Sequence, residues 1–268
     1  MTTSALRKPG RTTVPQGPSN PAWRGRILES CLEGSFLPGK AALTSFLVNA
    51  LYLFGDNSLF ALGGAPAGVA DELTRLGHRV AAGPEAGANR PGAGGRGSAG
   101  TGFSARKEGR YDRAVSLTQA FGRGGDAEIQ DRLRTMRRAV RPGGLICFHV
   151  FDRDRAWSLA GERALSGEDP ATRVRVGFDP STGRISVRLA RVAGRNGSED
   201  PGCGGSLAVK AWNRAEIETL LRGAGLELER LYGDWEGAGP ESPGSGRLIV
   251  VAARPRRARK KTRRNVQG

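Results

Sequence analysis

Residues 111–157 read YDRAVSLTQAFGRGGDAEIQDRLRTMRRAVRPGGLICFHVFDRDRAW, and this stretch decides the fold. It predicts a strand, a helix and a second strand. Residues 112–117 are a short, mostly apolar run, and residues 145–151 are a nearly unbroken one. Between them, the apolar side chains of residues 126–140 are spaced by four, three and four, which marks one face of a helix. These side chains are Ile129, Leu133, Met136 and Val140.

The charges and glycines around this helix support the same prediction. Acids occupy its first turns and arginines its last, as the helix dipole favours. Pro142-Gly143-Gly144 is expected to stop the helix, so that the second strand begins at Leu145. An apolar run of this kind suits a central parallel strand covered on both faces. Asp152 follows at the carboxyl edge of that sheet, where open α/β sheets bind ligands.

The composition predicts a cytoplasmic protein without a metal site. No apolar run approaches the ~20 residues that cross a bilayer, and the amino terminus has no block suited to a secretory signal. We therefore expect no membrane partner. The three cysteines are scattered without a CxxC spacing, which argues against disulfides and zinc.

The net charge of +16 belongs mainly to the chain ends. Residues 1–26 hold five basic residues and no acid, and residues 254–268 hold eight and no acid, which leaves only +3 for residues 27–253. Residues 1–22, rich in Pro, Ser, Thr and Gly, are predicted to be a disordered arm. Residues 254–268 are predicted to be a basic disordered tail, which is either only solubilising or a contact for nucleic acid.

Residues 23–253 are predicted to form one α/β domain. Its first half should contain one or two helices within 23–48, a strand at 58–62, a helix at 69–76 and a strand at 78–82. Glycine-rich residues 63–68 form the turn after the first strand. Residues 83–109 lack any pattern and are expected to be a flexible loop.

The second half should contain an insertion at 160–205 and three closing elements. Within the insertion we expect an irregular segment at 160–170, a hairpin with strands at 173–178 and 184–190, and a glycine-rich loop at 194–205. Asn213 and Glu216 are spaced as a capping box for a helix ending near residue 225. Strands at 226–232 and 247–253 follow.

Several of these segments together resemble one family. They are YDRAVSL at 111–117, AFG at 120–122, LRTMRRAVRPGG at 133–144, FDPSTG at 178–183, the capped helix 213–225 and YGDW at 232–235. From Leu59 onward the chain resembles class I S-adenosylmethionine-dependent methyltransferases of the small-molecule type. The resemblance implies an α/β fold: a Rossmann-like sheet, mostly parallel with an antiparallel last strand, plus an inserted β-hairpin.

The resemblance also implies S-adenosyl-L-methionine as cofactor, lying across the strand ends. The cofactor-binding residues it implies are Gly63, Gly64, Ala65, Glu85, Ser116, Leu117 and Gln119. The sequence departs from the family at the first turn, where alternate glycines and a preceding acid are usual. In this sequence the acid is replaced by Ala61. The first glycine is retained as Gly63, and the next two are replaced by Ala65 and Ala67. The usual acid after the second strand would fall near Pro84, with Glu85 beside it.

The substrate-binding candidates cluster at the same expected edge, and each has a structural alternative. They are Phe121, Asp152, Arg153, Arg155, Trp157, Tyr232 and Trp235. The charged ones serve either a polar acceptor or surface ion pairs, and the aromatic ones line a pocket or pack in the core. His149 is expected to be a satisfied buried residue rather than a base, and Cys147 an inert one. The catalytic residue is unassigned.

Three hypotheses of function follow. The first is a methyltransferase acting on a small molecule. The second is a catalytically degenerate relative that acts as a binding module, with nucleic acid bound through residues 254–268. An RNA methyltransferase that uses this tail is a third. The sequence names neither the acceptor nor the oligomeric state.

Overall fold

The computed structural model describes residues 38–66, 68–83, 108–117, 122, 126–164, 172–193, 198–199, 206–242 and 246–256. The predicted arm, most of the predicted 83–109 loop and all of the tail after residue 256 lie outside these ranges. No helix among the described residues is long and apolar enough to span a lipid bilayer.

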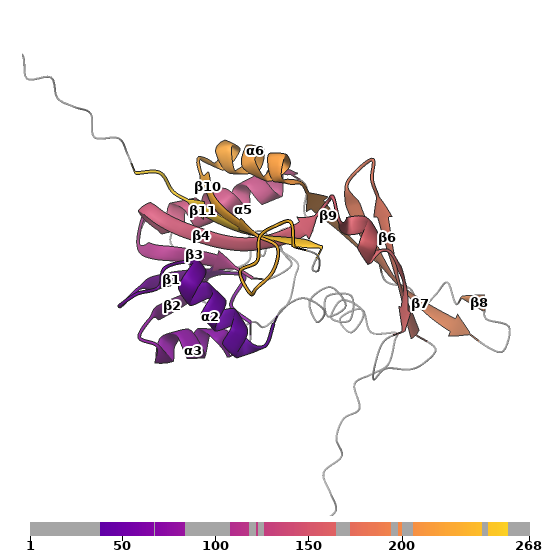
Figure 1. The fold of residues 1–268 in the computed structure, drawn as a ribbon, viewed down its shortest axis with the longest axis horizontal. Helices are drawn as coiled ribbons and strands as arrows, with labels where there is room; N and C mark the ends of the chain where they lie inside the picture. The colour runs from indigo at the N-terminus through magenta and orange to yellow at the C-terminus, as the bar shows by residue number, and fades with distance from the viewer. Residues whose placement is uncertain are drawn as a thin grey trace, which may run out of the picture.

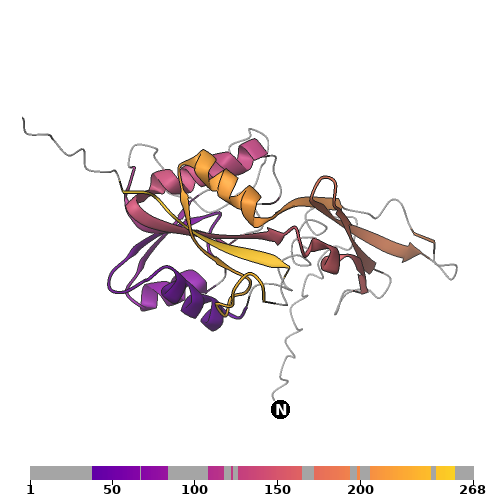
Figure 2. The ribbon, with the colours of Figure 1, turned by 45° about the horizontal axis from the view of Figure 1, so that its top comes forward.

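A twisted sheet with helices on both faces forms the main body (Figures 1 and 2). The strands are β1 (Ser58–Leu62), β2 (Arg79–Gly83), β3 (Tyr111–Ser116), β4 (Val140–Asp152), β10 (Glu227–Tyr232) and β11 (Arg247–Ala253). Parallel pairing gives the order β2-β1-β3-β4, and β11 joins β4 and β10 antiparallel to both. The predicted fold class, with an antiparallel last strand, is confirmed.

Within the described residues, two helices cover each face of this sheet. Figure 2 shows α2 (Lys40–Ala50) and α3 (Val69–Arg75) on one face, with α5 (Asp126–Ala139) and α6 (Arg214–Ala224) on the other. The apolar side chains predicted for the face of α5, Ile129 among them, are buried against the sheet. Asn213 and Glu216 exchange the two hydrogen bonds of a capping box at the start of α6, as predicted.

The predicted hairpin is part of a larger inserted sheet. Its strands are β6 (Thr172–Asp179) and β7 (Arg184–Ala193), which pair antiparallel. Three further strands were not predicted: β5 (Gly161–Ala164), β8 (Ser198–Glu199) and β9 (Ser206–Trp212). The expectation of an irregular 160–170 segment is therefore wrong for residues 161–164, and the expected 194–205 loop contains β8. A single-turn helix, η1 (Ala156–Leu159), packs beside β6.

Strand β9 joins the inserted sheet to the main one. It pairs antiparallel with β7, and its last two residues pair in parallel with Phe151 and Asp152 of β4. In Figure 1 β9 runs from the main sheet into the insertion. The position of the insertion is therefore fixed at the carboxyl end of β4.

Strand β4 also starts earlier than predicted. It begins at Val140, which pairs with Tyr111 of β3 across an irregularity in the register. Residues 143 and 144 then pair with the chain end: the Gly143 amide donates to the Arg254 carbonyl, and the Arg254 amide donates to the Gly144 carbonyl. Gly143 has φ +81°, which favours glycine. The Pro-Gly-Gly segment thus ends α5, as predicted, but belongs to the strand.

We predict that Gly144→Ala lowers the free energy of unfolding by about 1–3 kcal/mol, the usual cost of overpacking. A Cβ atom there would lie 2.7 Å from the Asp112 carbonyl oxygen and 2.9 Å from that of Arg141, and these backbone atoms cannot move alone. Gly239→Ala is the control, because its Cβ would have no atom within 4 Å. Urea denaturation measures both, and equal stability of the two variants would contradict this account.

Candidate functional site

The carboxyl ends of β1, β3 and β4 meet at one edge of the sheet. Ala61 of β1 pairs with Val115 of β3, and Ser116 pairs with Phe148 of β4. Strand β4 therefore continues four residues past the end of β3, to Asp152. The bend after β1 and the end of β4 lie on the same edge with β3 between them. Because β2 lies on one side of β1 and β3 on the other, this is also the switch point of the sheet order, where such folds bind ligands.

The bend after β1 takes the backbone conformation that only glycine adopts readily. Gly63 and Gly64 have φ values of +79° and +89°. The Gly63 amide donates to the Gly83 carbonyl and the Gly64 amide to the Ala61 carbonyl. Ala65 has no such strain, since Tyr52 is the one non-glycine residue with positive φ in the described part of the chain. A Cβ atom at Gly64 would point into open space.

Ser116 places a buried hydroxyl beside this bend. The residue is fully buried at the last position of β3. Its Oγ has no hydrogen-bond partner within the described ranges. A buried hydroxyl without a partner costs free energy, so a ligand atom that bonds it would gain affinity. This observation fits the prediction that Ser116 is a ligand-binding residue.

His149 links the neighbouring strands just below the edge. Its side chain is 3% exposed. Its Nε2 lies 3.1 Å from the Leu117 carbonyl oxygen, and its Nδ1 lies 3.0 Å from Nη1 of Arg247. Both ring nitrogens are thus used, which confirms the prediction of a satisfied buried residue. Arg247 was not among the predicted site residues.

Two buried groups of β4 have pKa values that suit a structural role. Burial, with the nearby positive charge of Arg247, lowers the pKa of His149 to about 3. The ring is therefore neutral at physiological pH. Burial raises the pKa of the Cys147 thiol to about 12, so that the thiol stays protonated and unreactive, as expected.

The charged candidates at the end of β4 are Asp152, Arg153 and Arg155, and both arginines have acidic partners. Arg153 is held by an ion pair, because its Nη1 donates to the Glu216 carboxylate at 2.6 Å, and its Nη2 donates to the Pro180 carbonyl. Arg155 stays near Asp152, with 3.7 Å between Nε and the carboxylate oxygen, and donates to the Ser242 carbonyl. Burial raises the pKa of the Asp152 carboxyl. The ion-pair alternative therefore describes Arg153 and Arg155.

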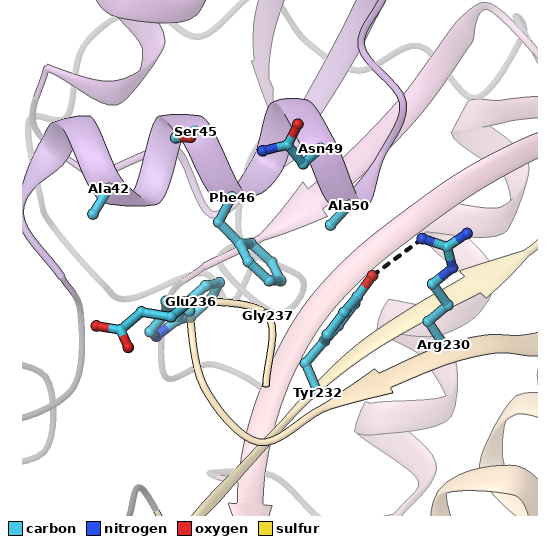
Figure 3. A pocket seen from close by; sticks show the side chains of 10 residues that line it. Ala42, Ser45, Phe46, Asn49, Ala50, Arg230, Tyr232, Glu236 and Gly237 are labelled. Atoms are coloured by element: carbon cyan, nitrogen blue, oxygen red, sulfur yellow. Dashed lines mark hydrogen bonds between the residues drawn. The ribbon is translucent and has the colours of Figure 1, made fainter. Parts of the chain in front are cut away.

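Two of the aromatic candidates line one pocket, of about 390 Å³, between α2 and the end of β10 (Figure 3). Tyr232 and Trp235 each meet the ring of Phe46 edge to face, with centroids 5.2 Å apart. Trp235 is buried, and its ring lies 5.6 Å from that of His149. Arg230 donates to the Tyr232 hydroxyl at the rim. Trp235 therefore both packs in the core and lines a pocket.

Of the remaining predicted site residues, the structure describes Trp157, which is not among the residues that line this pocket. Trp157 lies on η1 and is 70% exposed. Glu85, Gln119 and Phe121 lie outside the described residues, and their roles remain predictions. Phe46 was missed as a pocket residue, although its place in an apolar helix predicted burial.

Comparison with known proteins concerns the fold. No protein-family model and no curated protein matches the sequence. An S-adenosylmethionine-dependent methyltransferase from Clostridium acetobutylicum matches the structure with a TM-score of 0.59 at 9% identity, over 87% of this chain and 98% of that one. The methyltransferase CcbJ from Streptomyces caelestis matches with 0.55 at 18% identity, over 85% and 98%. The sugar N-methyltransferase KedS8 from Streptoalloteichus matches with 0.51 at 15% identity, over 96% and 98%. The chain has the class I methyltransferase fold, as its sequence predicted.

We predict that His149 makes folding sensitive to acid. An unfolded histidine has a pKa near 6.5 and the folded one a pKa near 3, so the unfolded chain binds one more proton between these values. The free energy of unfolding should therefore fall as the pH drops below 6.5, by up to ~1.4 kcal/mol per pH unit from this residue. Urea denaturation of wild type and His149→Gln at pH 7.5 and 5 isolates this contribution. Parallel pH dependences of the two proteins would contradict it.

Proposed function

We propose that the protein transfers the methyl group of S-adenosyl-L-methionine to a small-molecule acceptor. The fold supports this proposal, and one observation carries it to this chain: the Gly63-Gly64 bend stands beside the buried, unpartnered hydroxyl of Ser116 at the switch point of the sheet. A bend free of Cβ atoms lets a ligand approach the backbone, and the hydroxyl gains its missing bond.

The described residues at this edge fit the proposed cofactor. Gly63, Gly64 and Ala65 would hold one end of it and Ser116 and Leu117 another, with Glu85 and Gln119 added by the sequence resemblance. When bound, S-adenosylmethionine supplies a methyl group made electrophilic by its sulfonium. The contribution of the protein is then to bring the acceptor into line and to exclude water.

On the acceptor side, the residue proposed to receive the acceptor's proton is Asp152. Its carboxyl stands at the end of β4, and burial raises its pKa. Nε of Arg155 lies 3.7 Å from it. Tyr232 and Trp235 supply aromatic walls beside this edge, and Phe121 and Trp157 remain sequence-based candidates for acceptor contact.

The second candidate function is a binding module that has lost the cofactor. Ala61 favours it, because a fully buried alanine stands where the family has an acid. In this reading residues 254–268 bind nucleic acid. The chain end leaves the sheet beside Gly143 and Gly144, at the edge opposite the bend.

We predict that the full chain binds S-adenosylmethionine with micromolar affinity and that Gly64→Ala weakens binding about tenfold or more. Gly55→Ala is the matched control. Both glycines have positive φ, +89° and +71°, and neither has an atom within 4 Å of an added Cβ, so an alanine at either position is strained without a steric clash. Only Gly64 belongs to the bend. Isothermal titration calorimetry gives the affinities, and thermal denaturation compares the stabilities.

Two results would count against the enzyme. Absence of heat at millimolar S-adenosylmethionine, with the protein folded, would support the degenerate module. Equal loss of affinity in Gly64→Ala and Gly55→Ala would show that the bend has no special part in binding.

We further predict that truncation after Arg256 leaves cofactor affinity unchanged, because the tail departs from the opposite edge. This truncation keeps Arg254, whose Nη1 donates to the Arg137 and Val140 carbonyls and anchors the chain end. Binding of a single-stranded RNA, measured at several salt concentrations, tests the tail itself. A loss of affinity together with a shallower salt dependence would assign nucleic acid to it, and unchanged binding would remove that assignment.

A further inference from the structure

A chain of side-chain hydrogen bonds crosses three adjacent strands below the candidate site. It starts at Arg247 on β11, passes through His149 on β4 and ends at the carbonyl of Leu117, one residue beyond β3. The two contacts join residues separated by 98 and 32 positions in the chain. These side chains therefore connect the three strands one residue beyond Ser116 and Phe148, the last register pair of β3 and β4.

The chemistry of the partners sets the direction of each bond. A guanidinium can only donate hydrogen bonds, so Nδ1 of His149 must be the acceptor from Arg247. The single proton of the neutral ring then resides on Nε2, which donates it to the Leu117 carbonyl. Arg247 thereby selects the tautomer that can hold Leu117.

The surroundings of the ring keep this arrangement in place. Trp235 meets it edge to face at 5.6 Å. The guanidinium of Arg247 lies 4.9 Å from the centre of the Phe151 ring and is itself 2% exposed. Both members of the chain are thus shielded from water, which strengthens their hydrogen bonds.

The position of Leu117 gives the contact its significance. Its carbonyl is the first beyond the end of β3, so the His149 bond holds the peptide group that directly follows the last paired residue of that strand. Ser116 precedes it with the buried hydroxyl, and Gln119, a predicted cofactor contact, lies two residues further on. A shift of this carbonyl would also shift Ser116, whose hydroxyl is proposed to bind the cofactor.

We propose that His149 is a positioning residue for the methyl donor, acting through the Leu117 carbonyl with its tautomer set by Arg247. This inference rests on the proposed function. His149 touches neither reactant. It aligns the backbone at Ser116 and Leu117 before the cofactor arrives, so its effect falls on cofactor affinity.

The test compares two amides that mimic different halves of the ring. The side-chain nitrogen of Gln reaches the place of Nε2 and can donate to Leu117, whereas the oxygen of Asn takes the place of Nδ1 and leaves Leu117 unbonded. Both lose the aromatic contact with Trp235. We expect His149→Gln to bind S-adenosylmethionine within about threefold of wild type and His149→Asn to bind roughly tenfold more weakly, as loss of one buried hydrogen bond implies.

Calorimetry measures the affinities, and thermal denaturation shows how much of each variant is folded. Equal affinities of the two folded variants, whether both like wild type or both weakened, would overturn the proposal, because the Leu117 bond would then have no separate effect.

A readout without cofactor separates this proposal from the proposed function. In the wild type, ¹⁵N shifts of the His149 ring should show a protonated Nε2 and an unprotonated Nδ1; the opposite tautomer would overturn the proposal even if neither variant folds. The ¹³C shift of the Leu117 carbonyl should move in His149→Asn and stay in His149→Gln. Should wild type fail to bind S-adenosylmethionine while these shifts behave as expected, the proposed function fails and the hydrogen-bond chain stands as a structural tie.

Discussion

Strand β4 must be covered on both faces, and the rest of the molecule is arranged around this requirement. Alternate side chains, such as Ile146 and Phe148, pack under α5 and α6, and the intervening Leu145 and Cys147 pack on the side of α2 and α3. Each fully buried aliphatic or aromatic side chain contributes ~1.5–3 kcal/mol relative to exposure, so a strand this long outweighs any single polar contact. Because β4 is longer than β3, its end stands above the sheet edge and supplies both the site and the attachment of the insertion.

The elements that the sequence predicts well are those whose signal is local. Helix α5 is predicted by the spacing of its apolar residues and by the charges at its ends. Strand β4 is predicted by its apolar run and by the preceding Pro142-Gly143-Gly144. Strand β9 was missed although Leu207, Val209 and Ala211 alternate with more exposed residues. It follows a glycine-rich segment, and its place depends on pairing with β7 and with only two residues of β4. The start of β4 was misplaced for the same reason, because Val140 pairs with Tyr111 and the following glycines bond Arg254, both distant in the sequence.

In the candidate site, too, local sequence patterns predict some features and not others. The bend at Gly63 and the edge at Ser116 follow from local patterns and from the family resemblance. The partners of the charged and polar residues do not. Nothing near Arg153 in the sequence indicates that Glu216 will take its charge, and nothing near His149 indicates Arg247. Side-chain partners of this kind are decided by which strands become neighbours, so they become visible only once the sheet order is known.

Two departures from the motif of the family that the sequence resembles, Ala65 and Ala61, differ in physical meaning, and a third, Ala67, lies outside the described residues. Ala65 replaces a glycine at a position where the backbone keeps an ordinary φ, so the alanine costs no strain, and the residues with positive φ on either side of it in the described chain, Gly64 and Gly68, are glycines. Ala61 replaces an acid at a position that is fully buried among apolar side chains of the α2 and α3 face. A carboxylate there would be costly without a partner, and alanine removes that cost. The first departure therefore preserves the shape of the bend, and the second exchanges a polar contact for core packing. A cofactor held by this edge would depend on backbone groups of the bend and on Ser116 more than on a carboxylate before it.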